Sequence, residues 1–225
     1  MEDNTSSFDN MAVHSTKDWD QQIAEGRYLR GELFLQAAKS FVRPGGYILD
    51  YGCGPGRISV LLARNGFRVL GLDPTPEMLA MAKRQKLDGL KVDFQICSFS
   101  PEELPSEEFD GVVCSSVIEY APDPAQFLQV LRASLRPTGV LLISFANHLS
   151  LTRVWYNLAR RDDYLAARKH TWTGPRFLEL LRANGYTPEQ PPRYFNSSFD
   201  RVAPLRFLSA SRFWGGLGLV IARKK

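Results

Sequence analysis

Cysteine is scarce in this 225-residue chain, and long apolar runs are absent. The three cysteines, Cys53, Cys97 and Cys114, are widely spaced and form no Cys-x-x-Cys pair, which excludes a disulfide framework and a cysteine zinc site. No apolar stretch approaches the ~20 residues that cross a bilayer. The polar, acidic first 20 residues do not resemble a signal peptide. We therefore expect a cytoplasmic protein without a transmembrane segment.

Charge is distributed unevenly along the chain. Residues 1–150 carry 14 basic and 19 acidic side chains, a net of −5, whereas residues 151–225 carry 14 basic and 5 acidic ones, a net of +9. This asymmetry favours an anionic partner for the last third of the chain; a solvated basic surface is the alternative. The basic residues expected to contribute most are Arg153, Arg160, Arg161, Arg168 and Lys169.

Strand patterns alternate with helix patterns along most of the chain. This alternation predicts an α/β fold: a doubly wound, mostly parallel seven-stranded sheet that ends in an antiparallel hairpin. Helices are expected at 20–41, 58–65, 75–86, 125–135 and 175–184, and strands at 47–51, 67–73, 92–97, 109–116, 139–146, 194–195 and 217–223. We expect one domain, made of a helical cap (1–44), a ligand-binding core (45–146), a lid segment (147–173) and a last helix with the terminal hairpin (174–225).

A glycine-rich loop follows the first expected strand. The sequence Asp50-Tyr51-Gly52-Cys53-Gly54-Pro55-Gly56-Arg57 lies between strand and helix, where ligands of doubly wound sheets bind. A dinucleotide fingerprint starting at Gly52 would need a third glycine at position 57. Arg57 stands there, which argues against a dehydrogenase. Asp73 ends the second strand, where a carboxylate can bind both hydroxyls of a ribose; the loop and Asp73 together indicate an adenosine ligand.

These motifs resemble those of the class I S-adenosylmethionine-dependent methyltransferases, a Rossmann-like family. The resemblance extends through Cys97-Ser98-Phe99, FDGVVCSSVIEYAPDP (109–124) and LRPTGVLLIS (135–144) and covers about residues 45–146. It implies S-adenosylmethionine as cofactor. By the same resemblance Gly52, Gly54 and Gly56 lie under its methionine part, Asp50 helps to hold the amino group and Asp73 binds the ribose. The implied adenine-binding residues are Pro74, Thr75, Met78, Ser98 and Phe99, and Cys114 completes the cofactor set.

A looser similarity points to the ubiquinone-biosynthesis O-methyltransferases. Members of that branch tend to read Glu-Val-Leu-Glu-His where this chain has Ser116-Val117-Ile118-Glu119-Tyr120. Two of the three side chains that the branch is thought to use for a metal are therefore missing. One carboxylate, Glu119, is a weak Mg²⁺ site by itself. We expect no metal.

Two histidines and one arginine are further candidates. His148 directly follows the fifth strand, on the acceptor side, and His170 lies in the segment that relatives fold over the substrate. Either could act as the base that an alcohol or phenol acceptor needs; ordinary loop histidines are the alternative. Arg30, with Arg27 on the same helix, could meet the carboxylate of the cofactor; solvated surface arginines are the alternative.

The function expected is methyl transfer to an oxygen, or less readily a nitrogen, of a small acceptor that is anionic or carrier-bound. A nucleic acid or protein acceptor has only the basic last third in its favour, and no Asn/Asp-Pro-Pro-aromatic element follows the fourth strand. A non-catalytic S-adenosylmethionine-binding partner protein stays open too, because the transfer needs no obligatory side chain.

Overall fold

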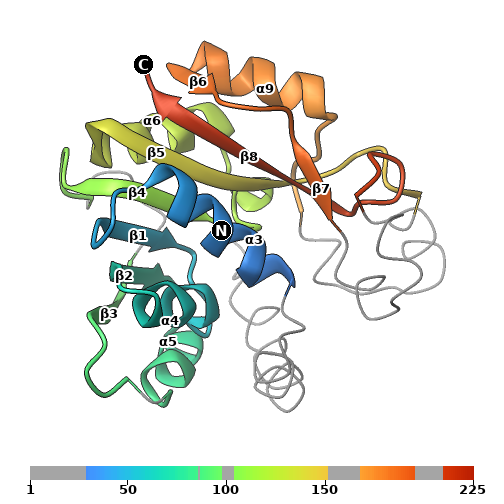
Figure 1. Ribbon diagram of the computed structural model, residues 1–225. Coiled ribbons are helices and arrows are strands. Elements are labelled where there is room, and N and C mark those ends of the chain that lie inside the picture. Colours follow the sequence, from blue (N-terminus) through green and yellow to red (C-terminus); the bar gives the residue numbers. More distant parts are fainter. Residues whose placement is uncertain (1–28, 86, 98–103, 152–167, 196–209) are drawn as a thin grey trace.

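The structure is a computed structural model, and it describes residues 29–85, 87–97, 104–151, 168–195 and 210–225. Its centre is one eight-stranded sheet (Figure 1). The strands run in the order β3-β2-β1-β4-β5-β8-β6, and β7 also pairs with β8. Their bounds are β1 Tyr47–Tyr51, β2 Arg68–Asp73, β3 Val92–Ile96, β4 Phe109–Cys114, β5 Leu135–Ala146, β6 Tyr186–Pro188, β7 Arg193–Phe195 and β8 Leu217–Lys224.

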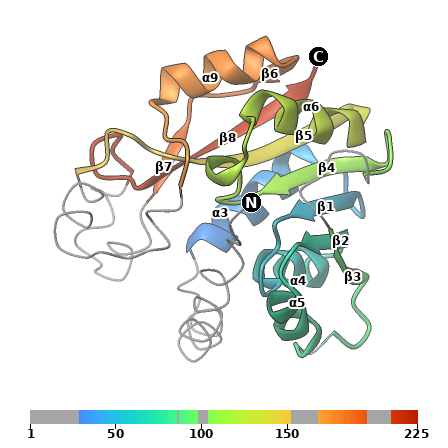
Figure 2. The ribbon, with the colours of Figure 1, turned by 180° about the vertical axis from the view of Figure 1, so that it is seen from behind.

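Helices cover both faces of the sheet, as Figures 1 and 2 show from opposite sides. Helices α3 (Leu29–Phe41), α4 (Arg57–Arg64) and α5 (Pro76–Lys83) pack on one face. Helices α6 (Pro124–Ser134) and α9 (Gly174–Ala183) pack on the other, and a 3₁₀ turn, η2, spans Ile118–Tyr120. Strands β1 to β5 pair in parallel, so their carboxyl ends meet at one edge. The doubly wound fold expected from the sequence is confirmed.

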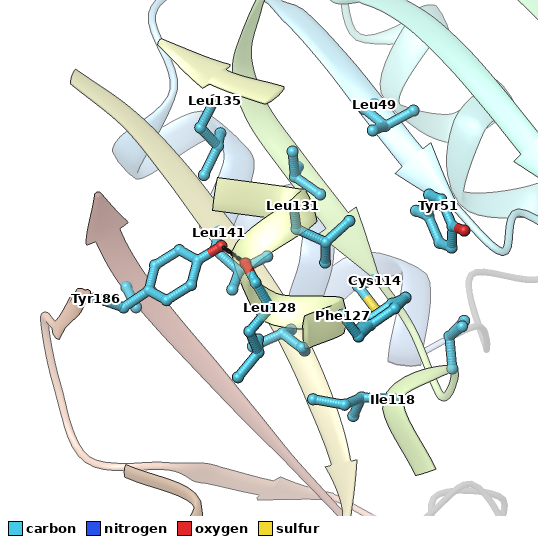
Figure 3. Packing of buried hydrophobic residues seen from close by; sticks show 14 of the residues in the cluster. Leu49, Tyr51, Cys114, Ile118, Phe127, Leu128, Leu131, Leu135, Leu141 and Tyr186 are labelled. Atoms are coloured by element: carbon cyan, nitrogen blue, oxygen red, sulfur yellow. Dashed lines mark hydrogen bonds between the residues drawn. The ribbon is translucent and has the colours of Figure 1, made fainter. Parts of the chain in front are cut away.

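The core on the α6 face shows how the elements are held together. Leu49 of β1, Leu128 of α6 and Tyr186 of β6 are buried in one apolar cluster (Figure 3). The Tyr186 hydroxyl donates a 2.9 Å hydrogen bond to the carbonyl oxygen of Leu128. Helix α6 begins where Asp123 accepts hydrogen bonds from the backbone N–H groups of Ala125 and Gln126, a normal helix cap. This packing fixes the loop before α6 beside the carboxyl ends of the strands.

The C-terminal part of the sheet differs from the prediction in one strand. Strand β8 pairs antiparallel with β5 and with β7, so the expected pairing of 194–195 with 217–223 is confirmed. Strand β6 was not predicted. It has three residues and ends in Pro188, so it is too short to show the alternation of apolar and polar residues that indicates a strand. Residue 135 was expected to end the preceding helix, whereas Leu135 pairs with Phe109 and begins β5.

Several predicted segments lie outside the described residues. They include the start of the helical cap with Arg27, the adenine-binding pair Ser98 and Phe99, and the part of the lid segment that carries Arg153, Arg160 and Arg161. The domain boundaries therefore stay a prediction. No helix in the part of the chain that the structure describes is long and apolar enough to cross a membrane.

Candidate functional site

The glycine loop is tied to the second strand. The backbone N–H groups of Gly52 and Cys53 both donate to the carbonyl oxygen of Leu72, at 2.8 and 2.9 Å. Three glycines of the loop have positive φ, 72° at Gly52, 53° at Gly54 and 77° at Gly56, a conformation that side-chain-bearing residues rarely adopt. The loop is thus fixed by backbone geometry before any ligand binds.

The three glycines differ in what a side chain would meet. A methyl group at Gly52 would overlap Val117, and one at Gly56 would lie 2.6 Å from the Phe94 ring and 2.9 Å from Ala82. At Gly54 a methyl group would have no neighbour within 4 Å. Gly52 and Gly56 are therefore required by packing, whereas Gly54 alone presents bare backbone to open space, where a ligand can approach it.

Asp73 lies against this open stretch of backbone. One of its carboxylate oxygens accepts a 2.7 Å hydrogen bond from the N–H of Gly54, and the other accepts a 3.0 Å bond from the N–H of Thr75. Burial raises the pKa of Asp73, and bonds from the backbone N–H groups of Thr75 and Gly54 and from the Thr75 side chain oppose the rise. A carboxylate offers about four lone-pair sites. Three of them are used here, so Asp73 retains a site for a ligand hydroxyl group such as a ribose presents.

Asp50, at the end of β1, is a second buried carboxylate. It is 1% exposed, and the hydroxyl of Ser59 on α4 donates a 2.6 Å hydrogen bond to its Oδ2. Burial raises the pKa of Asp50 to about 7; the bond from Ser59 works against this rise and the nearby charge of Asp73 adds to it. A cationic ligand group would favour the ionised form. This environment fits the amino group and sulfonium of S-adenosylmethionine.

The other predicted cofactor residues lie in three different parts of the fold. Pro74, Thr75 and Met78 lie at the end of β2 and the start of α5, beside Asp73. Arg30 is half-buried in the first turn of α3. The side chain of Cys114 is fully buried in the apolar cluster that Figure 3 shows, and its part in cofactor binding stays a prediction. Its side chain points into the α6 face because β4 alternates its residues between the two faces.

The two histidines have different surroundings. His148 is exposed, and its Nδ1 lies 3.0 Å from the hydroxyl of Thr171. His170 stacks on Trp172, with ring centroids 5.6 Å apart. Its Nε2 is buried and has no hydrogen-bond partner among the described residues. Of the two candidates, His170 is the one whose free ring nitrogen faces the interior.

Three serines are parts of this edge that the sequence analysis did not select. Ser59 binds Asp50. Ser116 has a φ of 60°, and its N–H donates a 2.9 Å bond to the hydroxyl of Ser144 on β5. Serines this far apart in sequence show no spacing that could have identified them. The one signal available was the position of Ser116, where relatives of the O-methyltransferase branch carry glutamate.

Two further features bear on ligands. A hollow of about 90 Å³ opens beside Tyr51, Asp123 and Phe127 and includes no predicted site residue. Within the described ranges, no three His, Cys, Asp or Glu side chains are grouped as a metal ion would need.

Comparison with known proteins agrees with this geometry. Residues 49–143 match a family described as "Methyltransferase domain". A ubiquinone biosynthesis O-methyltransferase of Xanthomonas campestris pv. campestris (strain B100) is 35% identical over 108 residues, which are 46% of this chain and 44% of that protein. The chain thus matches less than half of that relative's length.

Solved structures share the fold across almost the whole chain. A structure of the Haloferax volcanii Trm112 methyltransferase activator in complex with a methyltransferase gives a TM-score of 0.70 at 18% identity, covering 96% of this chain and 97% of the other. An S-adenosylmethionine-dependent methyltransferase from Mesorhizobium loti gives 0.66 at 23% identity, covering 84% and 96%. The family match, the O-methyltransferase relatives and the geometry of Asp73 and Gly54 together identify S-adenosylmethionine as the cofactor. Residues 49–143 therefore carry a methyltransferase domain, in a fold shared with S-adenosylmethionine-dependent methyltransferases.

Proposed function

We propose that this protein transfers a methyl group from S-adenosylmethionine to an oxygen atom of a small acceptor molecule. The ubiquinone biosynthesis O-methyltransferases that match its central part support oxygen as the target. The observation that carries the proposal is the free, buried Nε2 of His170, close to the carboxyl ends of β4 and β5. A neutral hydroxyl acceptor, unlike a neutral amine, needs a base at this position.

Each residue of the site has a separate role in this proposal. Asp73 and the Gly54 backbone hold the cofactor, which supplies an electrophilic methyl group on its sulfonium. Asp50, kept in place by Ser59, balances positive charge. His170 takes the proton that a hydroxyl loses as its oxygen is methylated, because a neutral imidazole has one ring nitrogen that accepts. Much of the remaining rate acceleration comes from holding the acceptor oxygen in line with the methyl group.

The acceptor is proposed to be anionic or carrier-bound. The support is the net charge of +9 over residues 151–225, because cationic groups around a site attract anions and raise encounter rates. Lys169 is exposed next to His170. The Nε of Arg168 donates a 3.4 Å bond to the hydroxyl of Tyr120, which places one more cation beside η2.

The experiment combines cofactor binding with methyl transfer to probe acceptors. Calorimetry should show micromolar binding of S-adenosylhomocysteine, about −8 kcal/mol. Asp73→Ala should weaken it by at least about tenfold, because hydrogen bonds to a charged group contribute about 1.5–3 kcal/mol. Unchanged affinity in that variant would remove Asp73 from the ribose site.

The transfer itself is followed with labelled S-adenosylmethionine and the three isomers of hydroxybenzoate, with 4-aminobenzoate as the nitrogen probe. We expect an O-methyl product, and a loss of about 10²-fold in turnover in His170→Ala while S-adenosylhomocysteine binds as in the wild type. The matched control is His148→Ala, which should retain turnover within about twofold since His148 faces solvent. Methylation of the amine probe alone would refute the oxygen assignment.

A further inference from the structure

Three buried polar atoms of the described chain lack a hydrogen-bond partner on the same side of the molecule. They are the hydroxyl oxygens of Ser115 and Ser116 and the Nε2 of His170. Buried polar atoms are nearly always paired, since leaving one unpaired costs stability. A group of unpaired atoms at one place therefore indicates a site that is completed by a polar ligand.

Backbone contacts bring the two segments together. Ser115 and Ser116 follow β4 directly, and His170 donates its N–H to the carbonyl oxygen of Glu119, three residues further along, at 3.1 Å. Between them Val117 packs so closely on Gly52 that no side chain fits there. The unpaired atoms thus lie beside the glycine loop, at the strand edge where doubly wound folds bind their ligands.

Ser116 also has a strained backbone. Its φ of 60° is in the left-handed region, which glycine or asparagine adopts more easily than serine. The conformation is held by the bond from its N–H to the Ser144 hydroxyl, which belongs to a fully buried residue of β5. Strain of this kind is retained where the surrounding structure enforces it, and it is commonest at functional sites. Glycine would relieve this strain and would remove the hydroxyl, so the Ser116 side chain can be tested without disturbing the turn.

We propose that Ser116, together with Ser115, binds a hydroxyl group of the acceptor, and that Ser144 is the positioning residue that holds Ser116 in place. A serine hydroxyl both donates and accepts hydrogen bonds, so the pair suits a hydroxyl group, which does the same, and not an apolar edge. The proposal rests on the proposed function, and it adds the residues that select the acceptor.

The test uses protein saturated with S-adenosylhomocysteine and two probes of similar shape, 3-hydroxybenzoate and 3-methylbenzoate. Calorimetry or ligand-observed NMR should show that the wild type prefers the hydroxyl probe. Ser116→Gly removes the hydroxyl but suits the left-handed backbone. We expect this variant to keep or raise Tm. Its affinity for the hydroxyl probe should fall by about fivefold or more, and its affinity for the methyl probe should not change. A role in the turn alone would leave both probes unchanged.

The positioning role of Ser144 is tested by a double-mutant cycle. Ser144→Ala should lower the affinity for the hydroxyl probe. Ser144→Thr, which keeps a hydroxyl, should retain part of that affinity. In the Ser116→Gly background, Ser144→Ala should have no further effect on this affinity. The matched control is Ser134→Ala, another buried serine, whose hydroxyl is bonded to Leu131 at the end of α6; it should leave both probes unaffected.

Two outcomes would overturn the proposal: a Ser116→Gly variant that binds 3-hydroxybenzoate as tightly as the wild type, or a wild type that does not prefer the hydroxyl probe. Failure of the proposed function would look different. In that case S-adenosylhomocysteine would not bind, or no hydroxyl probe would be methylated.

Discussion

The two sides of the site differ in how well their polar atoms are paired. On the proposed cofactor side, formed by Asp50, Gly54 and Asp73, both carboxylates already accept hydrogen bonds, from Ser59 and from the N–H groups of Gly54 and Thr75. On the proposed acceptor side, formed by Ser115, Ser116 and His170, three buried atoms have no partner in the described structure.

From this difference we infer how each proposed side would recognise its ligand. The cofactor side is preorganised, so binding there need not order the groups that make the contacts. The acceptor side carries unpaired polar atoms and a strained backbone, both of which cost stability until a suitable ligand pairs them. A site of that kind discriminates strongly between acceptors. A molecule without the matching polar group leaves the buried atoms unpaired and therefore binds more weakly.

The largest expected effect concerns the buried carboxylate of the cofactor side. The pKa of Asp50 is about 7 in the fold, against an ordinary value of 3.8. Between these two pH values the folded chain keeps a proton that the unfolded chain has lost, so this group lowers stability as pH rises from 4 to 7 and changes nothing above 7. Asp50→Asn cannot titrate. The stability of the wild type relative to this variant should therefore fall by up to about 4 kcal/mol across that window.

Urea unfolding of both proteins at several pH values measures this difference. Asp110→Asn is the control with the opposite sign. Burial acts to raise the pKa of Asp110, but bonds from Arg43, the Tyr47 N–H and Arg136 outweigh it and lower that pKa to about 2. The stability that Asp110 adds is complete above its ordinary value of 3.8 and is lost only as the pH falls toward 2, so its pH profile should be flat from 5 to 7. An equally flat profile for Asp50 would mean that its carboxyl group is not buried from water.

The same contrast explains what the sequence could and could not predict. The proposed cofactor side is built from one loop and one strand end, so the spacing of Gly52, Gly54, Gly56 and Asp73 was enough to predict that these residues lie together. The acceptor side is assembled from β4, β5 and residue 170, which only the folded sheet brings together. The pairing of Ser116 with Ser144 spans 28 positions and has no period. Cys114 was selected by position alone, and the sequence did not show that β4 turns it into the core.

An intermediate effect separates the structural glycines from the ligand-facing one. Gly56→Ala should lower the free energy of unfolding by about 2–4 kcal/mol, since it adds a left-handed alanine and an overlap with Phe94 and Ala82. Gly54→Ala meets open space, so it should cost only about 1 kcal/mol for its backbone. Its methyl group should nevertheless weaken S-adenosylhomocysteine several-fold in calorimetry. Normal binding by Gly54→Ala would show that the ligand approaches the loop elsewhere.

The smallest effect compares two serine hydroxyls, one from each side. Ser59→Ala at pH 8 should cost about 1.5–3 kcal/mol in urea unfolding, because its hydroxyl bonds the ionised Asp50. Ser115→Ala removes a buried hydroxyl without a partner, so stability should stay within about 0.5 kcal/mol of the wild type or rise, since an unpaired hydroxyl only costs desolvation. Both variants delete one oxygen atom from a side chain of the same type. A loss in Ser115→Ala as large as that in Ser59→Ala would mean that the acceptor side is already satisfied in the free protein, and the contrast between the two sides would fail.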